Sequence, residues 1–424
     1  MHKVIKIRCY PNKTQKALIN RILGTCRFVY NKFIEYNSSD KERKYVSSYD
    51  FSKLLTSWKK DETSEYYWIR EIHATKAIKD SINSAHDAYR NAFTVYKKTG
   101  VFHRPHFKKK GRANQESFFF IKDNIHIDNG KKNIIHIPIL KNIRVTKKNT
   151  LPYESFITSG RVIKTKNGKY YLMFIYMDEE KVFPKYNKGI GVDLGIEKYA
   201  TIAFKQTKMS MRPAIQMHHF KDLKKYKNLK EKIEKLQKII SNKVEINYGR
   251  LLHRWLDDNP GEELNEKQRN IMKGESYRYT NIMKLQRKVH KTYQKLTNIR
   301  TDYICKLVYN LVVILKPKYI TIEKLAISNM LQDNKYKKIH RHISDSSWYM
   351  FKQRLIQKCH EYHVELREAD KFFASSKTCS CCGHKNTNLT LSDRIYKCDK
   401  CGLEIDRDEN AALNLVSLKN YSIL

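Results

Sequence analysis

The sequence has 424 residues, with 84 Lys or Arg against 43 Asp or Glu, so its formal net charge is +41. The length allows two to four domains. The positive charge is spread along almost the whole chain, and so large an excess favours a long polyanion as partner. No run of about 18 apolar residues is present, and the N-terminus lacks the apolar segment of a signal peptide, so we expect neither a membrane span nor a secreted protein.

The first hundred residues predict one strand followed by helices. Residues 3–8 alternate apolar and charged side chains, as a strand does. Asn12 or Thr14 can cap a helix that starts after Pro11, and helical periodicity continues through 51–58 and 75–96. The helix from Ile72 onward carries a polar stripe, which is either a solvated face or a face laid along a nucleic-acid groove. Its members are Lys76, Lys79, Asn83 and Arg90.

A basic linker then leads into a strand-rich region. The linker, residues 102–111, contains Lys108, Lys109 and Lys110 among aromatic side chains. Short strand-like runs follow it, and Asn167-Gly168 between two of them is a strong hairpin signal. We interpret residues 114–178, with the strand at 3–8 as a further candidate member, as a small antiparallel barrel of the kind that often carries oligonucleotides.

Two acidic residues stand at the ends of apolar strands. One strand ends near Asp193, followed by a turn at Gly195 and a second strand from Tyr199; another strand, 318–323, ends in Glu323. A buried carboxylate needs compensation, either from backbone donors at the turn or from a functional partner such as a cation. Between these strands, residues 221–240 and 282–304 predict a pair of antiparallel helices.

The C-terminal region combines two Cys-x-x-Cys pairs with a group of acids. Four thiolates on two short hairpins form the tetrahedral set that Zn²⁺ prefers, so we expect one structural zinc ion. An extra cysteine, Cys381, leaves open a shift in which sulfurs bind. The four cysteines are Cys379, Cys382, Cys398 and Cys401, and the acids that follow are Glu404, Asp406, Asp408 and Glu409.

Three carboxylates, Asp193, Glu323 and Asp408, therefore stand out by context. Hydrolysis of a phosphodiester by two metal ions needs carboxylates that hold Mg²⁺ ions roughly 3.5–4 Å apart. Neighbouring strands of one sheet could bring these distant residues together. The order strand, strand, helix, strand, helix, strand and final helix is that of a ribonuclease-H-like domain.

These stretches resemble the TnpB family of transposon-encoded, RNA-guided DNA nucleases, which is related to type V CRISPR effectors. The similarity is carried by VDLGIEKYATIA, YITIEKL and the tail CSCCGHK…LSDRIYKCDKCGLEIDRDENAALNL, which look like the family's three RuvC-type nuclease motifs and zinc ribbon. FKKKGR near residue 107 and NIRTDYICKLV near residue 298 are similar to further family segments, so the resemblance spans nearly the whole chain. The insertion 241–281 departs from the plain helical hairpin expected.

The resemblance implies an α/β multidomain fold with a ribonuclease-H-like (RuvC) nuclease domain. We expect an oligonucleotide-binding-type wedge barrel at 1–10 and 105–182, and a helical recognition domain at 11–104. The nuclease domain would cover 183–372 and 403–424, with a helical hairpin at 221–304 and a zinc ribbon at 373–402 that binds the target strand.

The resemblance also assigns roles to individual residues. It makes Asp193, Glu323 and Asp408 ligands of two Mg²⁺ ions, with Asp406 as the alternative to Asp408. Arg394 looks like the arginine that contacts the scissile strand, the alternative being a salt bridge within the hairpin. Asn410 either orients a ligand or caps the last helix, and we favour the cap. Candidate contacts to nucleic acid are Lys76, Lys79, Asp80, Asn83, Arg90, Lys108, Lys109 and Lys110.

The function implied is an RNA-guided DNA endonuclease, monomeric and in the nucleoid-associated cytoplasm of a prokaryote. It would bind a guide RNA and double-stranded target DNA that carries a short adjacent motif. The alternatives are a miniature type V CRISPR effector and a guide-directed DNA-binding repressor. A transposase acting directly is disfavoured, because His340 and His342 have no evident partner tyrosine and are interpreted as solvated.

Overall fold

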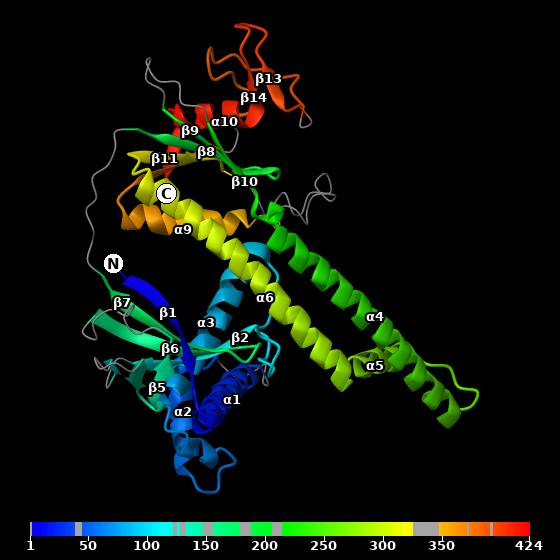
Figure 1. Cartoon of the computed structure of the whole chain (residues 1–424). Coiled ribbons are helices and arrows are strands. Elements are labelled where there is room, and N and C mark those ends of the chain that lie inside the picture. The colour runs from blue at the N-terminus through cyan, green and yellow to red at the C-terminus, as the bar shows by residue number, and fades with distance from the viewer. Residues whose placement is uncertain are drawn as a thin grey trace. The chain divides into compact units, whose positions relative to one another are not determined.

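The computed structural model describes residues 2–38, 45–121, 125–127, 133–146, 156–178, 188–205, 214–324, 347–370, 373–390 and 393–424. The chain divides into two compact units, Met1–Glu179 and Glu180–Leu424. Each unit contains helices and a sheet, so the fold is of the mixed α/β class (Figure 1). Among the described helices, none combines the length and the apolar character needed to cross a bilayer. His340 and His342 lie outside the described residues.

The sheet of the first unit is antiparallel and has the order β2-β6-β7-β1-β5-β4-β3. Strand β1 therefore lies in the middle, and the predicted hairpin at Asn167-Gly168 joins β6 to β7. The described strands form an open series, because no pairing joins the end strands β2 and β3 to each other as a barrel would require. The strands are β1 (His2–Tyr10), β2 (Gln115–Ile121), β3 (His126–Ile127), β4 (Ile134–Ile137), β5 (Lys141–Val145), β6 (Ile157–Thr165) and β7 (Tyr170–Met177).

The helices of the first unit pack on this sheet and share its core. They are α1 (Lys13–Tyr36), α2 (Ser48–Lys60), the 3₁₀ helix η1 (Tyr67–Glu71) and α3 (Thr75–Thr99). Asn12 caps α1 in a capping box with Gln15, which satisfies two backbone donors at the helix start. Buried Phe33 and Ile82 from the helices belong to one apolar cluster with Leu172 from the sheet. The helical region and the strand-rich region, expected as separate domains, thus form one unit.

The second unit is built on a six-stranded mixed sheet with the order β10-β9-β8-β11-β12-β15. Strands β8, β11 and β12 are parallel, and the other pairs are antiparallel. All four residues of β11 are buried, as expected for a short apolar strand covered on both faces. The strands are β8 (Ile190–Asp193), β9 (Lys198–Phe204), β10 (Ile215–His218), β11 (Tyr319–Ile322), β12 (Glu365–Ala369) and β15 (Tyr421–Ile423).

Strands β10 and β15 have no counterpart in the sequence prediction. The final helix of the predicted order is present, but it is not the last element of the structure. Helix α10 (Arg407–Val416) is followed by β15, which pairs antiparallel with β12. Helix α9 (Trp348–Glu361) precedes β12 and contributes Phe351 and Leu355 to the core of this sheet.

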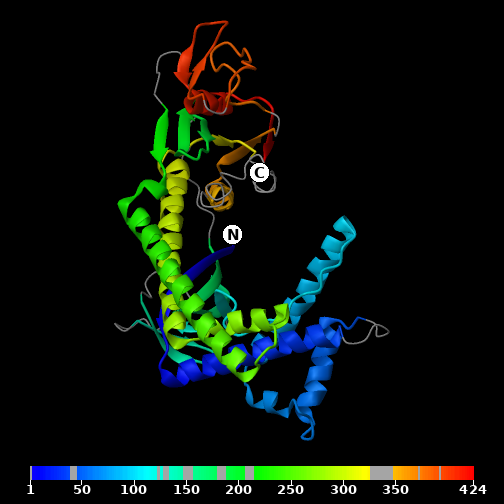
Figure 2. The same cartoon turned by 90° about the vertical axis from the view of Figure 1, so that its right-hand side faces the viewer.

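A long helical hairpin connects β10 to β11. It consists of the short η3 (Phe220–Asp222), then α4 (Lys224–Asp258), α5 (Glu266–Ser276) and α6 (Thr280–Tyr309), which continues into the π-helical turn η4 (Asn310–Ile314). Helices α4 and α6 lie side by side (Figures 1 and 2). The predicted first helix ended at residue 240, whereas α4 continues to Asp258, because the first strong breaker is Asn259-Pro260-Gly261. The insertion is therefore mostly helical.

A small zinc-ribbon-like segment lies between β12 and α10. Its two strands, β13 (Ile395–Lys397) and β14 (Glu404–Asp406), pair antiparallel. It has an apolar core of its own that contains only Cys379, Leu389, Tyr396 and Cys398 at full burial. A core this small does not ordinarily hold a fold without a metal or another cross-link.

Candidate metal centres

Asp193 and Glu323 lie side by side where two neighbouring strands of the central sheet end. Strands β8 and β11 are parallel neighbours with Val192 opposite Ile322, so the next residue of each strand is an acid at the same edge. Both carboxylates are half-buried. Residues 130 positions apart in the sequence thus become neighbours through one strand register.

Asp408 reaches the same edge from helix α10. This helix packs directly on β8, where the missing side chain of Gly191 leaves room for its backbone. A Cβ on Gly191 would lie 2.2 Å from the carbonyl oxygen of Ala412. Asp408 lies in the first turn of the helix, and its Oδ2 is 4.0 Å from the position of a Cβ on Gly195, in the turn after Asp193.

The electrostatics of this edge reflect crowded negative charge. Burial, and then the neighbouring carboxylates of Glu323 and Asp408, raise the pKa of Asp193 well above its usual range, while the guanidinium of Arg407 opposes the shift. Burial also raises the pKa of Glu323. No hydrogen bond from a described residue reaches the Asp193 carboxylate, so backbone donors do not satisfy it. Like charges held together in this way favour an added cation.

The spacing of the three carboxylates differs from that of a compact single-ion site. Among the described residues, the four cysteines form the one group of three or more metal-binding side chains whose ligand atoms all lie within 4.8 Å of one another. Asp193, Glu323 and Asp408 are therefore spread more widely. Carboxylate oxygens are the ligands that hard cations prefer, so these three residues are candidate ligands for such ions.

The structure separates the roles of Asp406 and Asp408. The Asp406 side chain is the N-cap of α10: its Oδ1 accepts hydrogen bonds from the backbone N–H groups of Asp408 (2.9 Å) and Glu409 (3.1 Å). Asp408 instead forms an ion pair with Arg407 at 3.5 Å, and it raises the pKa of Asp193 more than Asp406 does. Asp408 is thus the more available ligand.

The preference for Asn410 as the helix cap is wrong. Asp406 already occupies the cap. Asn410 is the fourth residue of the helix, and it is fully buried. Its amide donates to the carbonyl of Thr378 at 2.7 Å, and its Oδ1 accepts from the N–H of Ser380 at 2.9 Å. Asn410 therefore fixes the segment around Cys379.

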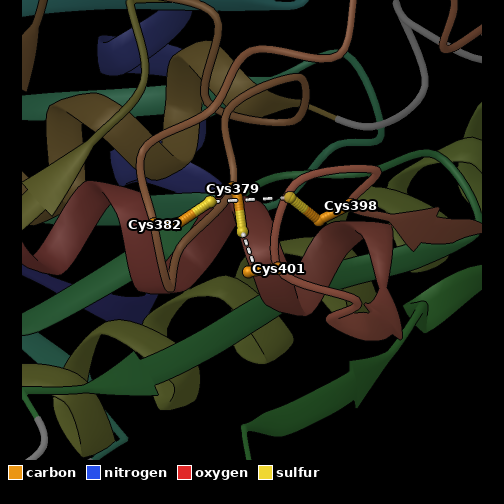
Figure 3. Close-up of side chains that lie close together, drawn as sticks. All are labelled: Cys379, Cys382, Cys398 and Cys401. Atoms are coloured by element: carbon orange, nitrogen blue, oxygen red, sulfur yellow. Dashed lines mark hydrogen bonds between the residues drawn. The ribbon is translucent and has the colours of Figure 1, made fainter.

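The four cysteine sulfurs converge between two matching turns (Figure 3). The Sγ atoms of Cys379 and Cys401 are 3.6 Å apart, and those of Cys382 and Cys398 are 3.5 Å apart. These separations are too long for disulfides and close to the roughly 3.8 Å edge of a tetrahedron with Zn–S bonds of about 2.3 Å. The group can hold one metal ion, and Cys381, which is exposed, is not part of it.

Matching backbone turns present these sulfurs. The N–H groups of Gly383 and Gly402 donate to the carbonyls of Cys379 and Cys398 respectively, each at 2.9 Å. Both glycines have φ of 72°, a left-handed conformation that a side chain would strain. The sequence pattern Cys-x-x-Cys-Gly therefore builds the same turn twice.

Arg394 does not form a salt bridge within the hairpin, which was the alternative to a contact with nucleic acid. Its Nη2 lies 3.0 Å from Oε2 of Glu197, in the turn between β8 and β9. The two side chains are 57% and 64% exposed, so water screens the pair. Arg394 remains accessible beside the edge that carries Asp193.

The remaining candidates lie in the first unit and differ in accessibility. Lys76, Lys79, Asn83 and Arg90 are exposed along α3, and Lys108, Lys109 and Lys110 are exposed in the linker. Asp80 instead pairs with Arg161 of β6 at 2.8 Å, so it attaches α3 to the sheet. Although Lys108 is exposed as a whole residue, its ammonium lies 3.7 Å from the centre of the Tyr30 ring, and desolvation of the ammonium lowers its pKa. Asp80, Lys108 and Arg161 line a cavity of about 640 Å³.

Sequence reasoning missed several residues that build these centres. Arg407 lies beside Asp408 and limits the rise in the pKa of Asp193. Asn414 joins Asn410 in contacting the ribbon, at a spacing of one helical turn that the sequence displays. No sequence signal indicated that Gly191, among several glycines, is the one covered by a helix.

Several proteins are similar in sequence to this chain over almost its full length. TnpB-like protein L79 of Acanthamoeba polyphaga mimivirus is 25% identical over 435 residues, covering 97% of this chain and 72% of that protein. A protein of Streptomyces pristinaespiralis, provisionally named RNA-guided DNA endonuclease, is 27% identical over 417 residues, covering 98% of this chain and 89% of its own. Over almost its full length, the chain is therefore similar to TnpB-like proteins and to proteins named as RNA-guided DNA endonucleases.

Two segments of the chain match family models. Residues 348–415 match the model "Cas12f1-like, TNB domain", which spans α9, the four cysteines and most of α10. Residues 1–43 match a model described as a helix-turn-helix domain; the described part of this range, 2–38, forms β1 and α1. The CRISPR-associated endodeoxyribonuclease Cas12f1 of Sulfoacidibacillus thermotolerans is 31% identical over 75 residues, 18% of each chain.

Solved structures give more distant similarity. The CasPhi-2 (Cas12j) chain bound to crRNA aligns with 98% of this chain and 97% of its own, at 9% identity and a TM-score of 0.48. The Cas12f1–sgRNA–target DNA complex aligns at 15% identity and a TM-score of 0.32, covering 98% of this chain and 99% of the other.

Proposed function

We propose that this protein is an RNA-guided DNA endonuclease. It binds a guide RNA, recognises a short motif beside its target and hydrolyses phosphodiester bonds of double-stranded DNA. The observation that carries the proposal is the convergence of Asp193, Glu323 and Asp408 at one edge of the sheet, in a chain that is similar to TnpB-like proteins over almost its full length. Full-length relatives carry the name RNA-guided DNA endonuclease.

Asp193, Glu323 and Asp408 would hold two Mg²⁺ ions. Bound there, the ions would supply an activated water and stabilise the leaving oxygen of the phosphodiester. The crowding that raises the pKa of Asp193 supports this assignment, because a cation would relieve the repulsion among the three carboxylates. Arg407 forms an ion pair with Asp408 at 3.5 Å, which helps to hold that carboxylate in place.

Each structural unit would have its own role in guided cleavage. The second unit is a ribonuclease-H-like (RuvC) nuclease domain, supported by its mixed sheet with an acid after the first strand and another after the fourth. The cysteine group holds one zinc ion and makes residues 373–402 a ribbon that presents Arg394 to the cleaved strand. The first unit combines the recognition helices with the wedge sheet and binds guide RNA and the target-adjacent motif.

Charge supports the choice of nucleic acid as partner. The net charge of +41 needs a polyanion, and exposed cations follow α3 and the linker of the first unit. Lys76, Lys79, Asn83 and Arg90 are free to contact DNA or RNA. Asp80 is already paired with Arg161, so it contributes to the shape of this surface instead of contacting a base directly.

Two measurements test the proposal. RNA that copurifies with the protein should contain a discrete species with a fixed scaffold and a variable end; random cellular RNA would favour a non-specific basic binder. The complex should then cut a matched plasmid in Mg²⁺, and Asp193→Ala should abolish cutting while RNA binding persists. Cutting by Asp193→Ala at the normal rate would show that the carboxylate edge is not the catalytic centre.

A guide-directed repressor without cleavage is the second candidate. The protein retains all three carboxylates in one place, whereas a repressor does not need them. The same plasmid assay separates the two functions, because a repressor would bind the matched target and leave it intact. A miniature type V CRISPR effector would share the chemistry and differ by a repeat array near its gene.

A further inference from the structure

Helix α10 is attached to the cysteine ribbon at two places. The chain enters the helix from β14, which follows the second cysteine pair, Cys398 and Cys401. Side chains of the helix reach back to the first pair. Figure 2 shows β13 and β14 beside α10. The helix that carries Asp408 is therefore connected to both halves of the metal-binding group.

Two asparagines make the second attachment. Asn410, which is fully buried, donates to the carbonyl of Thr378 at 2.7 Å and accepts from the N–H of Ser380 at 2.9 Å. Asn414, one helical turn later, donates to the same Thr378 carbonyl at 2.6 Å and to that of Ser375 at 2.8 Å. Both donors converge on one carbonyl, so a single position of the ribbon satisfies all these contacts.

The contacted backbone groups flank a metal ligand. Thr378 and Ser380 are the residues immediately before and after Cys379. Two backbone hydrogen bonds close the turn of Cys379, one from its own N–H to the carbonyl of His384 and one from the N–H of Gly383 to its carbonyl. Because the ribbon has a very small core of its own, its folding depends on the bound metal. Metal binding by the four cysteines therefore determines whether the ribbon backbone that α10 contacts is held in one position.

We infer that Asn410 and Asn414 are positioning residues that couple the cysteine metal site to the placement of Asp408 at the nuclease centre. The inference rests on the proposed function. Asn410 lies two residues from Asp408, so a shift of the first turn of α10 moves the carboxylate relative to Asp193 and Glu323. Coupling is reciprocal: metal in the ribbon favours the working position of Asp408, and the two asparagines favour retention of the metal.

The decisive variant is Asn410→Asp. It keeps the shape and the acceptor for Ser380, but it places an oxygen in front of the Thr378 carbonyl, where two acceptors repel. Groups that hold a metal ligand from outside typically contribute about 10–100-fold to metal affinity. We therefore expect zinc release to a colorimetric chelator to be at least about tenfold faster. Asn388→Asp, at an exposed asparagine of the same ribbon, is the matched control.

Cleavage is measured as a function of Mg²⁺ concentration with the purified protein–guide RNA complex. Asn410→Asp should require at least about tenfold more Mg²⁺ for half-maximal cleavage, with the rate at saturating Mg²⁺ changed less. Asn414→Ala, which leaves both contacts of Asn410, should shift both readouts in the same direction by less. It also tests the inference if Asn410→Asp does not fold.

The outcomes separate the inference from the proposed function. If zinc release and Mg²⁺ dependence of both asparagine variants equal those of Asn388→Asp, the coupling is absent. If the protein with its guide never cleaves, the proposed function is wrong, while the zinc-release comparison still decides whether Asn410 and Asn414 hold the metal site. An equal loss of rate at every Mg²⁺ concentration would assign them a purely structural role and overturn the inference.

Discussion

Replacement of Gly191 by alanine should disable cleavage from a position that no substrate touches. The added Cβ would lie 2.2 Å from the carbonyl oxygen of Ala412 and 2.6 Å from the backbone nitrogen of Val416. Ordinary contact begins at 3.4 Å, so β8 and α10 must separate by about 1.2 Å, the difference between the shortest contact and that limit. Both obstacles are backbone atoms, which cannot rotate away.

The displacement acts on the candidate nuclease centre because β8 ends in Asp193 and α10 carries Asp408. A misplacement of about 1 Å can lower a rate by about 100-fold, and we expect a loss of that order for Gly191→Ala. Overpacking should also destabilise the second unit by about 1–3 kcal/mol. For a unit of this size, each kcal/mol corresponds to a fall of roughly 2–4 °C in melting temperature.

The assay is single-turnover cleavage of a matched plasmid by the protein–guide RNA complex at saturating Mg²⁺, together with a thermal melt. The control is Gly249→Ala, at a glycine of α4 where an added Cβ meets nothing within 4 Å. This change should leave cleavage intact and leave stability equal or slightly raised. If Gly191→Ala cleaves at the rate of the control, the close packing of α10 on β8 is not what positions Asp408 for catalysis.

Three further predictions concern charge and metal. In metal-free protein, the raised pKa of Asp193 means that stability falls as pH rises from the ordinary carboxyl range through the folded-state pKa; Asp193→Asn should therefore raise the melting temperature at neutral pH, with a gain that shrinks in acid and disappears with Mg²⁺ present. Replacing Cys398 and Cys401 by serine should abolish zinc binding, measured by metal analysis, and lower the melting temperature; a zinc-free protein of unchanged stability would contradict the ribbon assignment. Removing the exposed pair of Arg394 and Glu197 should change stability by at most about 1 kcal/mol, so a large cleavage defect in Arg394→Ala that Glu197→Ala lacks would identify Arg394 as a contact to DNA; equal cleavage by both variants would contradict that role.

Local features of the structure follow closely from the sequence. The cap at Asn12, the hairpin at Asn167-Gly168 and the main helices and apolar strands are where local residue preferences place them. Helix α4 extends beyond its predicted end because apolar side chains continue at helical spacing through Val244, Tyr248 and Leu252, and no strong helix breaker precedes Asn259. Strands β10 and β15 were missed because they are short and partly exposed, so they lack the buried apolar run that marks the equally short β8 and β11.

The sequence by itself determined which residue types could do chemistry: the cysteine pairs, whose spacing builds the same turn twice, and acids at the ends of apolar strands. Tertiary structure alone decided how they combine. The register of β8 on β11 places Asp193 beside Glu323, and the N-cap engages Asp406 and leaves Asp408 available. Propensity and capping act over a few residues, whereas these placements depend on packing between segments far apart in the chain, which no local pattern encodes.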